Sequence, residues 1–204
     1  MIITTGTADQ YTPEIAELIW AEDPALLACE FGALPPFDAI LRQEWASKGA
    51  ANSHDTMLLA RDDTGVAGLM TGYPVDQMEA RFEATWHLRR DQIARKDWQD
   101  WEARSALIER LFPPPQAGDF YVLDLSIAPR SQGTGLGRRL IGIALENARA
   151  AGCKRLCLDV NADNDAVGFY RRIGLDIQIE SRVPLLNERY GVGLHYHMVM
   201  PVTA

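Results

Sequence analysis

A glycine-rich turn that runs directly into a helix constrains the fold of this chain most. Residues 132–139 read Gln-Gly-Thr-Gly-Leu-Gly-Arg-Arg, and they lie between an alternating strand pattern and an amphipathic helix pattern without proline. Glycines allow positive φ and the close approach of a ligand to the main chain. The first N–H groups of a helix have no intrahelical partner, and the helix dipole favours negative charge there. The sequence therefore predicts a strand-turn-helix unit with an anion site at the turn.

Spacing separates three phosphate-binding motifs. A Walker loop ends in Gly-Lys-Ser/Thr, but Gly137 is followed by two arginines, so nucleotide hydrolysis is not expected. A dinucleotide fingerprint counted from Gly133 and Gly135 needs its third glycine at the position of Arg138, which excludes that motif by one residue. The spacing that fits is Gln-x-x-Gly-x-Gly, starting at Gln132. This segment resembles the pyrophosphate loop of the GNAT family of N-acetyltransferases.

A second segment strengthens this resemblance. Residues 163–175 follow a short strand pattern, and they place Tyr170 four residues after Ala166 and a helix-closing glycine at Gly174. The two segments have the order and separation of the family's signatures. The resemblance is close over residues 119–175 and rests elsewhere on element order. One departure is Asp163, where family members commonly have asparagine, so that contact to the cofactor is expected from Asn161 or Asn164 instead.

The resemblance implies a fold and a reaction. The fold is a single α/β domain over residues 1–204, with a mixed, largely antiparallel sheet flanked by helices. The acetyl donor is acetyl-CoA, and a primary amine attacks its thioester directly in a ternary complex. Neither a covalent enzyme intermediate nor a metal is implied.

The same resemblance assigns site residues. Leu125 and Ile127 are expected to contact the cofactor through their main chain, with the Ile127 N–H as a candidate oxyanion donor. The residues expected to bind acetyl-CoA are Leu125, Ile127, Gln132, Gly133, Thr134, Gly135, Leu136, Gly137, Arg138 and Asn164. Tyr170 is expected to protonate the departing thiolate, although helical periodicity alone would make it a core aromatic.

The base has several candidates. Asp124 lies on the alternating strand 120–127, which leads to the acetyl site, but a buried carboxylate bonded to a neighbouring loop fits the pattern equally well. His195 is a further candidate. It shares a face of the final strand with His197, and no third ligand for a metal is evident.

Composition narrows the partners and the compartment. The formal net charge of −8 argues against nonspecific nucleic-acid binding and is compatible with a cationic acceptor. No apolar run reaches the roughly 18 residues of a membrane span, and the first residues do not resemble a signal peptide. We therefore expect a cytoplasmic protein without membrane contact. The three cysteines are expected to be reduced thiols.

The remaining pattern predicts the order of elements. Residues 1–5 form a strand, 13–22 a helix, and the proline pair at 35–36 opens a second helix. Residues 56–61 and 66–73 form a hairpin. The segment 76–118 lacks strand pattern and predicts a helical insert, whose tryptophans either pack it onto the body or form a lid over the acceptor site.

Three questions remain open at this stage. A non-catalytic acyl-CoA-binding regulatory module would have the same glycine loop. The acceptor is either a small-molecule amine or a peptide amine. A homodimer is possible through the last strand, whose face carries Leu194, Tyr196, Met198 and Met200.

Overall fold

The computed structural model describes residues 1–203. Its core is a seven-stranded sheet in the order β1-β2-β3-β4-β5-β7-β6. Neighbouring strands are antiparallel except for β4 and β5, which are parallel. The predicted mixed, largely antiparallel sheet is confirmed. The strands are β1 (Ile2–Thr5), β2 (Met57–Asp62), β3 (Gly65–Pro74), β4 (Asp119–Ile127), β5 (Arg155–Asn161), β6 (Asp176–Ser181) and β7 (His195–Pro201).

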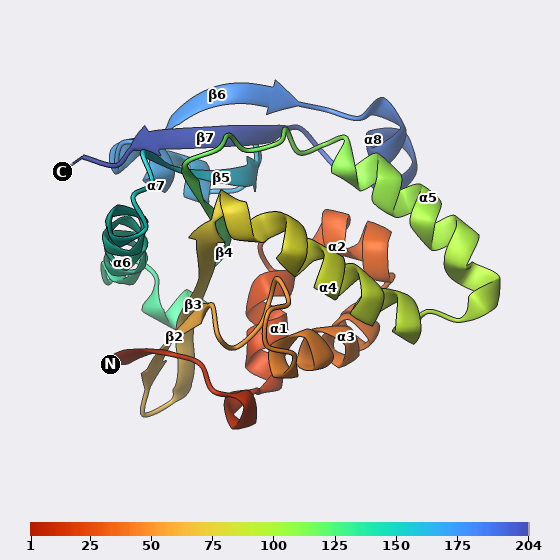
Figure 1. Cartoon of the computed structure of the whole chain (residues 1–204), viewed down its shortest axis with the longest axis horizontal. Helices are drawn as coiled ribbons and strands as arrows, with labels where there is room; N and C mark the ends of the chain where they lie inside the picture. The colour runs from red at the N-terminus through yellow and green to blue at the C-terminus, as the bar shows by residue number, and fades with distance from the viewer. Residues whose placement is uncertain (204) are drawn as a thin grey trace.

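Helices cover both faces of the sheet. In Figure 1, α6 and α7 lie on one side of the strands and α1 to α5 on the other. The helices are α1 (Pro13–Trp20), α2 (Pro24–Phe31), α3 (Leu34–Ala46), α4 (Met78–Gln92), α5 (Trp98–Glu109), α6 (Leu136–Ala150), α7 (Ala166–Arg172) and α8 (Pro184–Tyr190). Residues at helical spacing on α6, among them Leu140, Ala144 and Ala148, are fully buried in one core. Leu41 and Trp45 of α3 are fully buried in the second.

Strands β4 and β5 diverge along their length. Their pairing covers residues 119–122 of β4 and 155–158 of β5, after which β5 pairs with β7 alone. Residues 123–127 of β4 therefore have an edge without a neighbouring strand. Such an edge presents main-chain N–H and C=O groups for pairing with a ligand.

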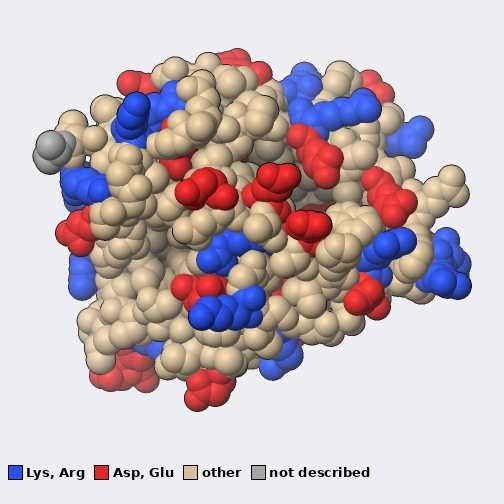
Figure 2. Space-filling view, viewed as in Figure 1, with Lys and Arg blue, Asp and Glu red and all other residues tan. Residues whose placement is uncertain are grey.

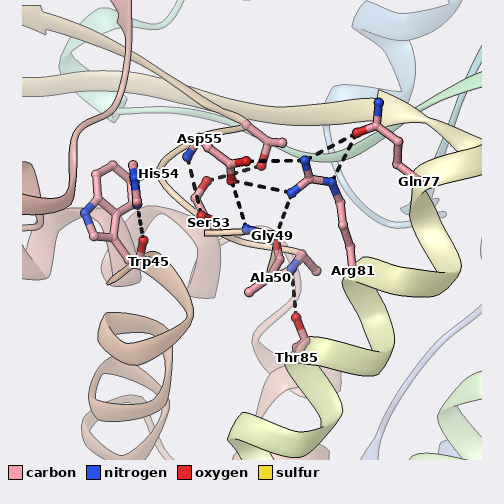
Figure 3. A network of polar contacts seen from close by, with 11 residues as sticks. Trp45, Gly49, Ala50, Ser53, His54, Asp55, Gln77, Arg81 and Thr85 are labelled. Carbon is pink, nitrogen blue, oxygen red and sulfur yellow. Dashed lines mark hydrogen bonds and ion pairs between the residues drawn. The ribbon is translucent and has the colours of Figure 1, made fainter. Parts of the chain in front are cut away.

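Helix α4 is tied firmly to the body (Figure 3). Arg81 forms an ion pair with Asp55 at 3.4 Å and donates to the Ala50 carbonyl at 3.2 Å. One turn further along, the buried Thr85 hydroxyl accepts the Ala51 N–H at 2.7 Å. These contacts join α4 to the loop between α3 and β2. These contacts therefore hold α4 in a fixed position relative to the sheet.

The structure contains elements that the sequence analysis did not predict. Helix α2 lies between the two predicted N-terminal helices, and β6 and α8 precede the last strand. Strand β7 is an interior strand, and Met198 on its apolar face is fully buried in the core. That face is therefore covered within the chain, which removes the reason for expecting a homodimer through it.

No single helix among residues 1–203 is long and apolar enough to cross a membrane. The pair α2 and α3, bent by 83°, reaches the length and composition of a span only when the two are taken together.

Candidate active site

A cleft of about 1840 Å³ joins the glycine-rich loop to the helical insert. One end is lined by the loop and the start of α6, the middle by the open edge of β4, and the far end by α2, α4 and α5. Figure 2 shows acidic side chains around a hollow in this face of the molecule. The predicted loop and the predicted catalytic residues thus lie along one continuous surface.

The glycine loop has the conformation that its sequence predicts. Gly133 and Gly135 have φ of 74° and 85°, in the left-handed region that favours glycine. A Cβ at either position would meet nothing within 4 Å, so the loop is open towards a ligand. No side chain caps α6 at Gly135, which leaves its first N–H groups available to an anion.

Side chains of the loop have distinct roles. Gln132 and Arg138 line the cleft. The Gln132 amide also donates to the Ile127 carbonyl at 3.4 Å. Thr134, which the sequence analysis assigned to cofactor binding, does not line the cleft, and its hydroxyl donates to the Ser131 carbonyl at 2.7 Å. The observed contact of Thr134 therefore stabilises the loop on the side away from the cleft.

Along the open edge of β4, the main-chain N–H group of every second residue points away from β3. Ala128 donates its N–H to Ala67 on β3 at 2.9 Å. Because successive N–H groups of a strand point in opposite directions, those of Ile127 and Leu125 point to the open side. Leu125 meets the Glu22 carboxylate there, at 3.4 Å. The structure thus places both predicted main-chain groups on the cleft.

Glu22 is a site residue that the sequence analysis missed. It lies in the turn between α1 and α2, and Asn164 fixes this turn by donating to the Glu22 carbonyl at 3.0 Å. Burial raises the pKa of the Glu22 carboxyl well above its usual value, and the nearby Asp124 carboxyl raises it further. The hydrogen bond from the Leu125 N–H lowers this pKa, but by less. One Glu22 oxygen is buried and has no hydrogen-bond partner among residues 1–203. In sequence, Glu22 was only the last residue of the predicted helix 13–22, and nothing there connected it to the site.

Asn164 lines the cleft and joins two segments of the chain. Its amide nitrogen donates to the Glu22 carbonyl at 3.0 Å, and its amide oxygen accepts the Ala166 N–H at 2.8 Å at the start of α7. The expected contact of Asn164 to the cofactor stays a prediction.

Asp124 is buried opposite Thr71 in the β3–β4 register. Burial raises the pKa of Asp124 to about 7, against the lowering effect of the Thr71 hydroxyl. One of its oxygens is buried without a partner. Asp124 and Glu22 therefore form a pair of interacting carboxyls whose protonation states depend on each other.

Tyr170 occupies the same part of the cleft on α7. It is 5% exposed, and burial together with the Glu22 carboxyl raises the pKa of its hydroxyl well above the usual value. The phenol is therefore protonated at neutral pH. It has the form required of a proton donor.

A protein-family model matches residues 13–175 of this chain, and its description is the acetyltransferase (GNAT) family. The chain belongs to the GNAT family. GNAT enzymes use acetyl-CoA as acetyl donor, so the chain is by family an acetyltransferase with that cofactor. The open glycine loop and the uncapped N-terminus of α6 fit the phosphates of acetyl-CoA.

Individual relatives agree with the GNAT assignment. A 61-residue stretch is 41% identical to mycothiol acetyltransferase of Saccharopolyspora erythraea, and this match spans 29% of the chain and 20% of that protein. An N-acetyltransferase from Staphylococcus aureus Mu50 has a similar fold, with a TM-score of 0.71, 12% identity, and coverage of 98% of this chain and 100% of that chain. The NatC complex bound to Gag peptide and CoA gives a TM-score of 0.56, 13% identity, and coverage of 99% and 98%.

Both histidines of β7 have carboxylate partners. His195 lies 2.8 Å from Asp23, and His197 lies 2.9 Å from Asp159. Burial raises the pKa of Asp23, but the bonds from His195 and Leu26 outweigh this effect and hold it below its usual value. Within residues 1–203, no group of three or more His, Cys, Asp or Glu side chains is arranged to hold a metal ion.

The insert tryptophans fall into two groups in this GNAT chain. Trp86 and Trp101 line the cleft, with ring centroids 6.0 Å apart. Trp98 lies away from it, donates its indole N–H to the Ile93 carbonyl at 2.9 Å, and has the Arg90 and Arg95 guanidinium groups over its ring. Trp98 therefore packs the insert, whereas Trp101 has the position that the predicted lid over an acceptor site requires.

Proposed function

We propose that this protein transfers the acetyl group of acetyl-CoA to a primary amine by direct attack in a ternary complex. The observation that carries this proposal is one cleft connecting the open glycine loop to a tyrosine and two carboxyls at the open edge of β4. Acetyl-CoA, when bound, supplies the thioester whose acyl carbon the amine attacks. The residues of the chain bind, orient and exchange protons.

Binding would rest on main-chain groups. The N–H groups at the start of α6 and the Arg138 side chain face the end of the cleft where pyrophosphate fits. The open edge of β4 offers main-chain pairing to an extended chain. The Ile127 N–H, on the same side, would donate to the carbonyl oxygen as negative charge develops there.

The Tyr170 hydroxyl would donate a proton to the leaving sulfur. Its raised pKa keeps it protonated at physiological pH, and its buried position excludes bulk water from the transfer. No covalent intermediate on the protein is required.

The carboxyl pair would take the proton from the attacking amine. An amine enters as an ammonium ion, which cannot attack until it loses a proton. The pKa of Asp124, about 7, lies near the operating pH, where a base is most effective. Glu22 stabilises the proton on the pair because two buried carboxylates repel each other.

Calorimetry with acetyl-CoA tests the cofactor assignment. We expect saturable binding by the wild type and loss of binding in Gly135→Glu, which introduces bulk and negative charge at the start of α6. Gly152→Glu is the matched control, because Gly152 also has positive φ and open surroundings but follows the other end of α6. Equal losses in both variants would assign the effect to backbone strain, and absence of wild-type binding would overturn the proposal.

An amine screen with acetyl-CoA then tests transfer. Release of coenzyme A that depends on an amine, with the acetylated amine found by mass spectrometry, is the expected result. Binding of acetyl-CoA without transfer to any amine would favour the non-catalytic module.

A further inference from the structure

The end of the cleft between α4 and α5 is acidic and aromatic. Glu79, Glu83 and Trp86 of α4 line it, at the spacing of one helix face, and Trp101 and Glu109 of α5 line it as well. The three glutamates are exposed at the rim. Aromatic rings and carboxylates together bind cations, the rings through their negative faces.

Among residues 1–203, the cation that lines this end is Arg89, and it is already neutralised. Arg89 donates to Glu44 and to Glu30, each at 2.7 Å. Two carboxylates thus surround one guanidinium, and nearby charges from Glu30 and Glu44 outweigh the effect of burial and raise the pKa of Arg89. The helical end of the cleft keeps an excess of negative charge.

Buried polar groups at this end have no protein partner within residues 1–203. The Trp101 indole N–H is unpaired although the side chain is only 2% exposed, and the Asn52 side-chain oxygen is unpaired at 5% exposure. Both side chains line the cleft. Trp98, one turn away, has its N–H bonded and two guanidinium groups over its ring. Trp86 shares the Arg90 guanidinium, which lies 5.0 Å from its ring centroid. Among the described residues of this end, the Trp101 N–H and the Asn52 oxygen are therefore left for a ligand.

We infer that the α4–α5 end of the cleft is a second cation subsite, and that the acceptor is an alkyl diamine or polyamine. This inference rests on the proposed function and specifies its acceptor. One amine would reach Glu22 and Asp124, where it loses its proton. The second ammonium would stay charged between Glu83 and Glu109, with the connecting methylenes against Trp86 and Trp101. The fixed attachment of α4 to the body (Figure 3) keeps this subsite formed before the acceptor enters.

Matched acceptors test the inference. Hexamethylenediamine and hexylamine present the same reacting amine and differ in the second ammonium. We expect kcat/KM to be at least roughly tenfold higher for the diamine, because one additional hydrogen bond to a charged group changes affinity by about that factor. Shorter and longer diamines would locate the optimal distance between the two ammonium groups.

Charge-removing variants identify the residues. The double variant Glu83→Gln with Glu109→Gln should remove most of the diamine preference while leaving hexylamine turnover and acetyl-CoA KM unchanged. Glu102→Gln is the control, since Glu102 is exposed on α5 and does not line the cleft. Equal use of both amines by the wild type, or a preference unaffected by the double variant, would overturn the inference.

A binding measurement separates this inference from the acetyltransfer proposal. Hexamethylenediamine alone should quench tryptophan fluorescence saturably in the wild type and in Trp98→Phe, and not in the double glutamate variant. Saturable quenching without turnover would support the subsite while contradicting the proposed reaction. Absence of saturable quenching would overturn the subsite even if monoamines are acetylated.

Discussion

The carboxylate of Glu22 accepts the main-chain N–H of Leu125 at 3.4 Å, on the part of β4 that β5 does not pair. This contact brings the turn after α1 to the open edge of the sheet. It places a second carboxyl near Asp124 and near the Tyr170 hydroxyl. The Asp124 charge raises the pKa of Glu22, and the Glu22 charge raises the pKa of Tyr170.

Glu22→Gln should leave the acid limb of the reaction in place. The charge of Asp124 raises the pKa of Glu22, whereas burial raises the pKa of Asp124 to about 7. Asp124 therefore ionises while Glu22 is still protonated, so the acid limb of kcat/KM should stay near pH 7 in the variant. Glu17→Gln, on the exposed side of α1, is the control. An acid limb at lower pH would show that the Glu22 carboxylate also raises the pKa of Asp124.

Asp124→Asn should alter stability in a pH-dependent way. The folded pKa of Asp124, about 7, is above its unfolded value near 3.9, so folding favours the protonated form. Its contribution to stability is full below about pH 4 and is lost as pH rises through about 7. Relative to wild type, the variant should be more stable at pH 8 than at pH 5, by of the order of 1–4 kcal/mol in urea unfolding. The same difference at both pH values would contradict the raised pKa.

Tyr170→Phe should separate catalysis from packing. The ring remains in the core while the proton donor is removed, so kcat should fall by roughly 10²–10⁴-fold. Acetyl-CoA binding and unfolding free energy should change little. Steady-state kinetics with calorimetry on the same samples gives both quantities. Near-normal kcat would assign Tyr170 to the core alone.

The sequence predicts the cofactor half of this molecule well because its information there is local. The glycine turn before α6 specifies both its backbone and its ligand chemistry, and positive φ at Gly133 and Gly135 follows from residue type. Alternation along β4 likewise identifies Asp124 as a residue on the path to the site. These inferences required no knowledge of long-range contacts.

The other half of the site depends on contacts between distant segments. Glu22 reaches the site only because α1 packs beneath β4, where the Ser126 hydroxyl donates to the Leu18 carbonyl at 2.7 Å. Helix α2 has apolar residues around most of its circumference and gave no amphipathic pattern, although Asp23 and Pro24 form a capping sequence at its start. The different environments of Trp98 and Trp101 depend on how α5 folds back over α2.

Trp101→Phe and Trp98→Phe should have different effects. The first removes an unpaired N–H that lines the acceptor end of the cleft, so it should raise the acceptor KM by several-fold at unchanged acetyl-CoA KM. The second removes the bond to Ile93 and should cost about 1 kcal/mol of stability with unchanged kinetics. Both follow from initial-rate measurements with each substrate varied in turn. Parallel changes in the two KM values for Trp101→Phe would contradict an acceptor-side role.

Arg89→Met should destabilise the fold far more than Arg81→Met. Loss of Arg89 leaves Glu30 and Glu44 without their cation, and Glu44 is only 1% exposed. Breaking a buried pair of this kind costs about 3–5 kcal/mol. The carboxylate left by Arg81→Met is Asp55, which is 21% exposed and can be hydrated, so that loss should be about 1 kcal/mol.

The cost of Arg89→Met should also depend on pH. Burial raises the pKa of Glu44 even against Arg89, and removing the guanidinium should raise it further. Folding without the guanidinium then favours the protonated carboxyl, so the loss of unfolding free energy should be larger at pH 8 than at pH 5. Urea unfolding of wild type and both variants at the two pH values measures this. If Arg89→Met loses no more unfolding free energy than Arg81→Met, the ion pairs of Arg89 with Glu30 and Glu44 add little to the stability of the fold.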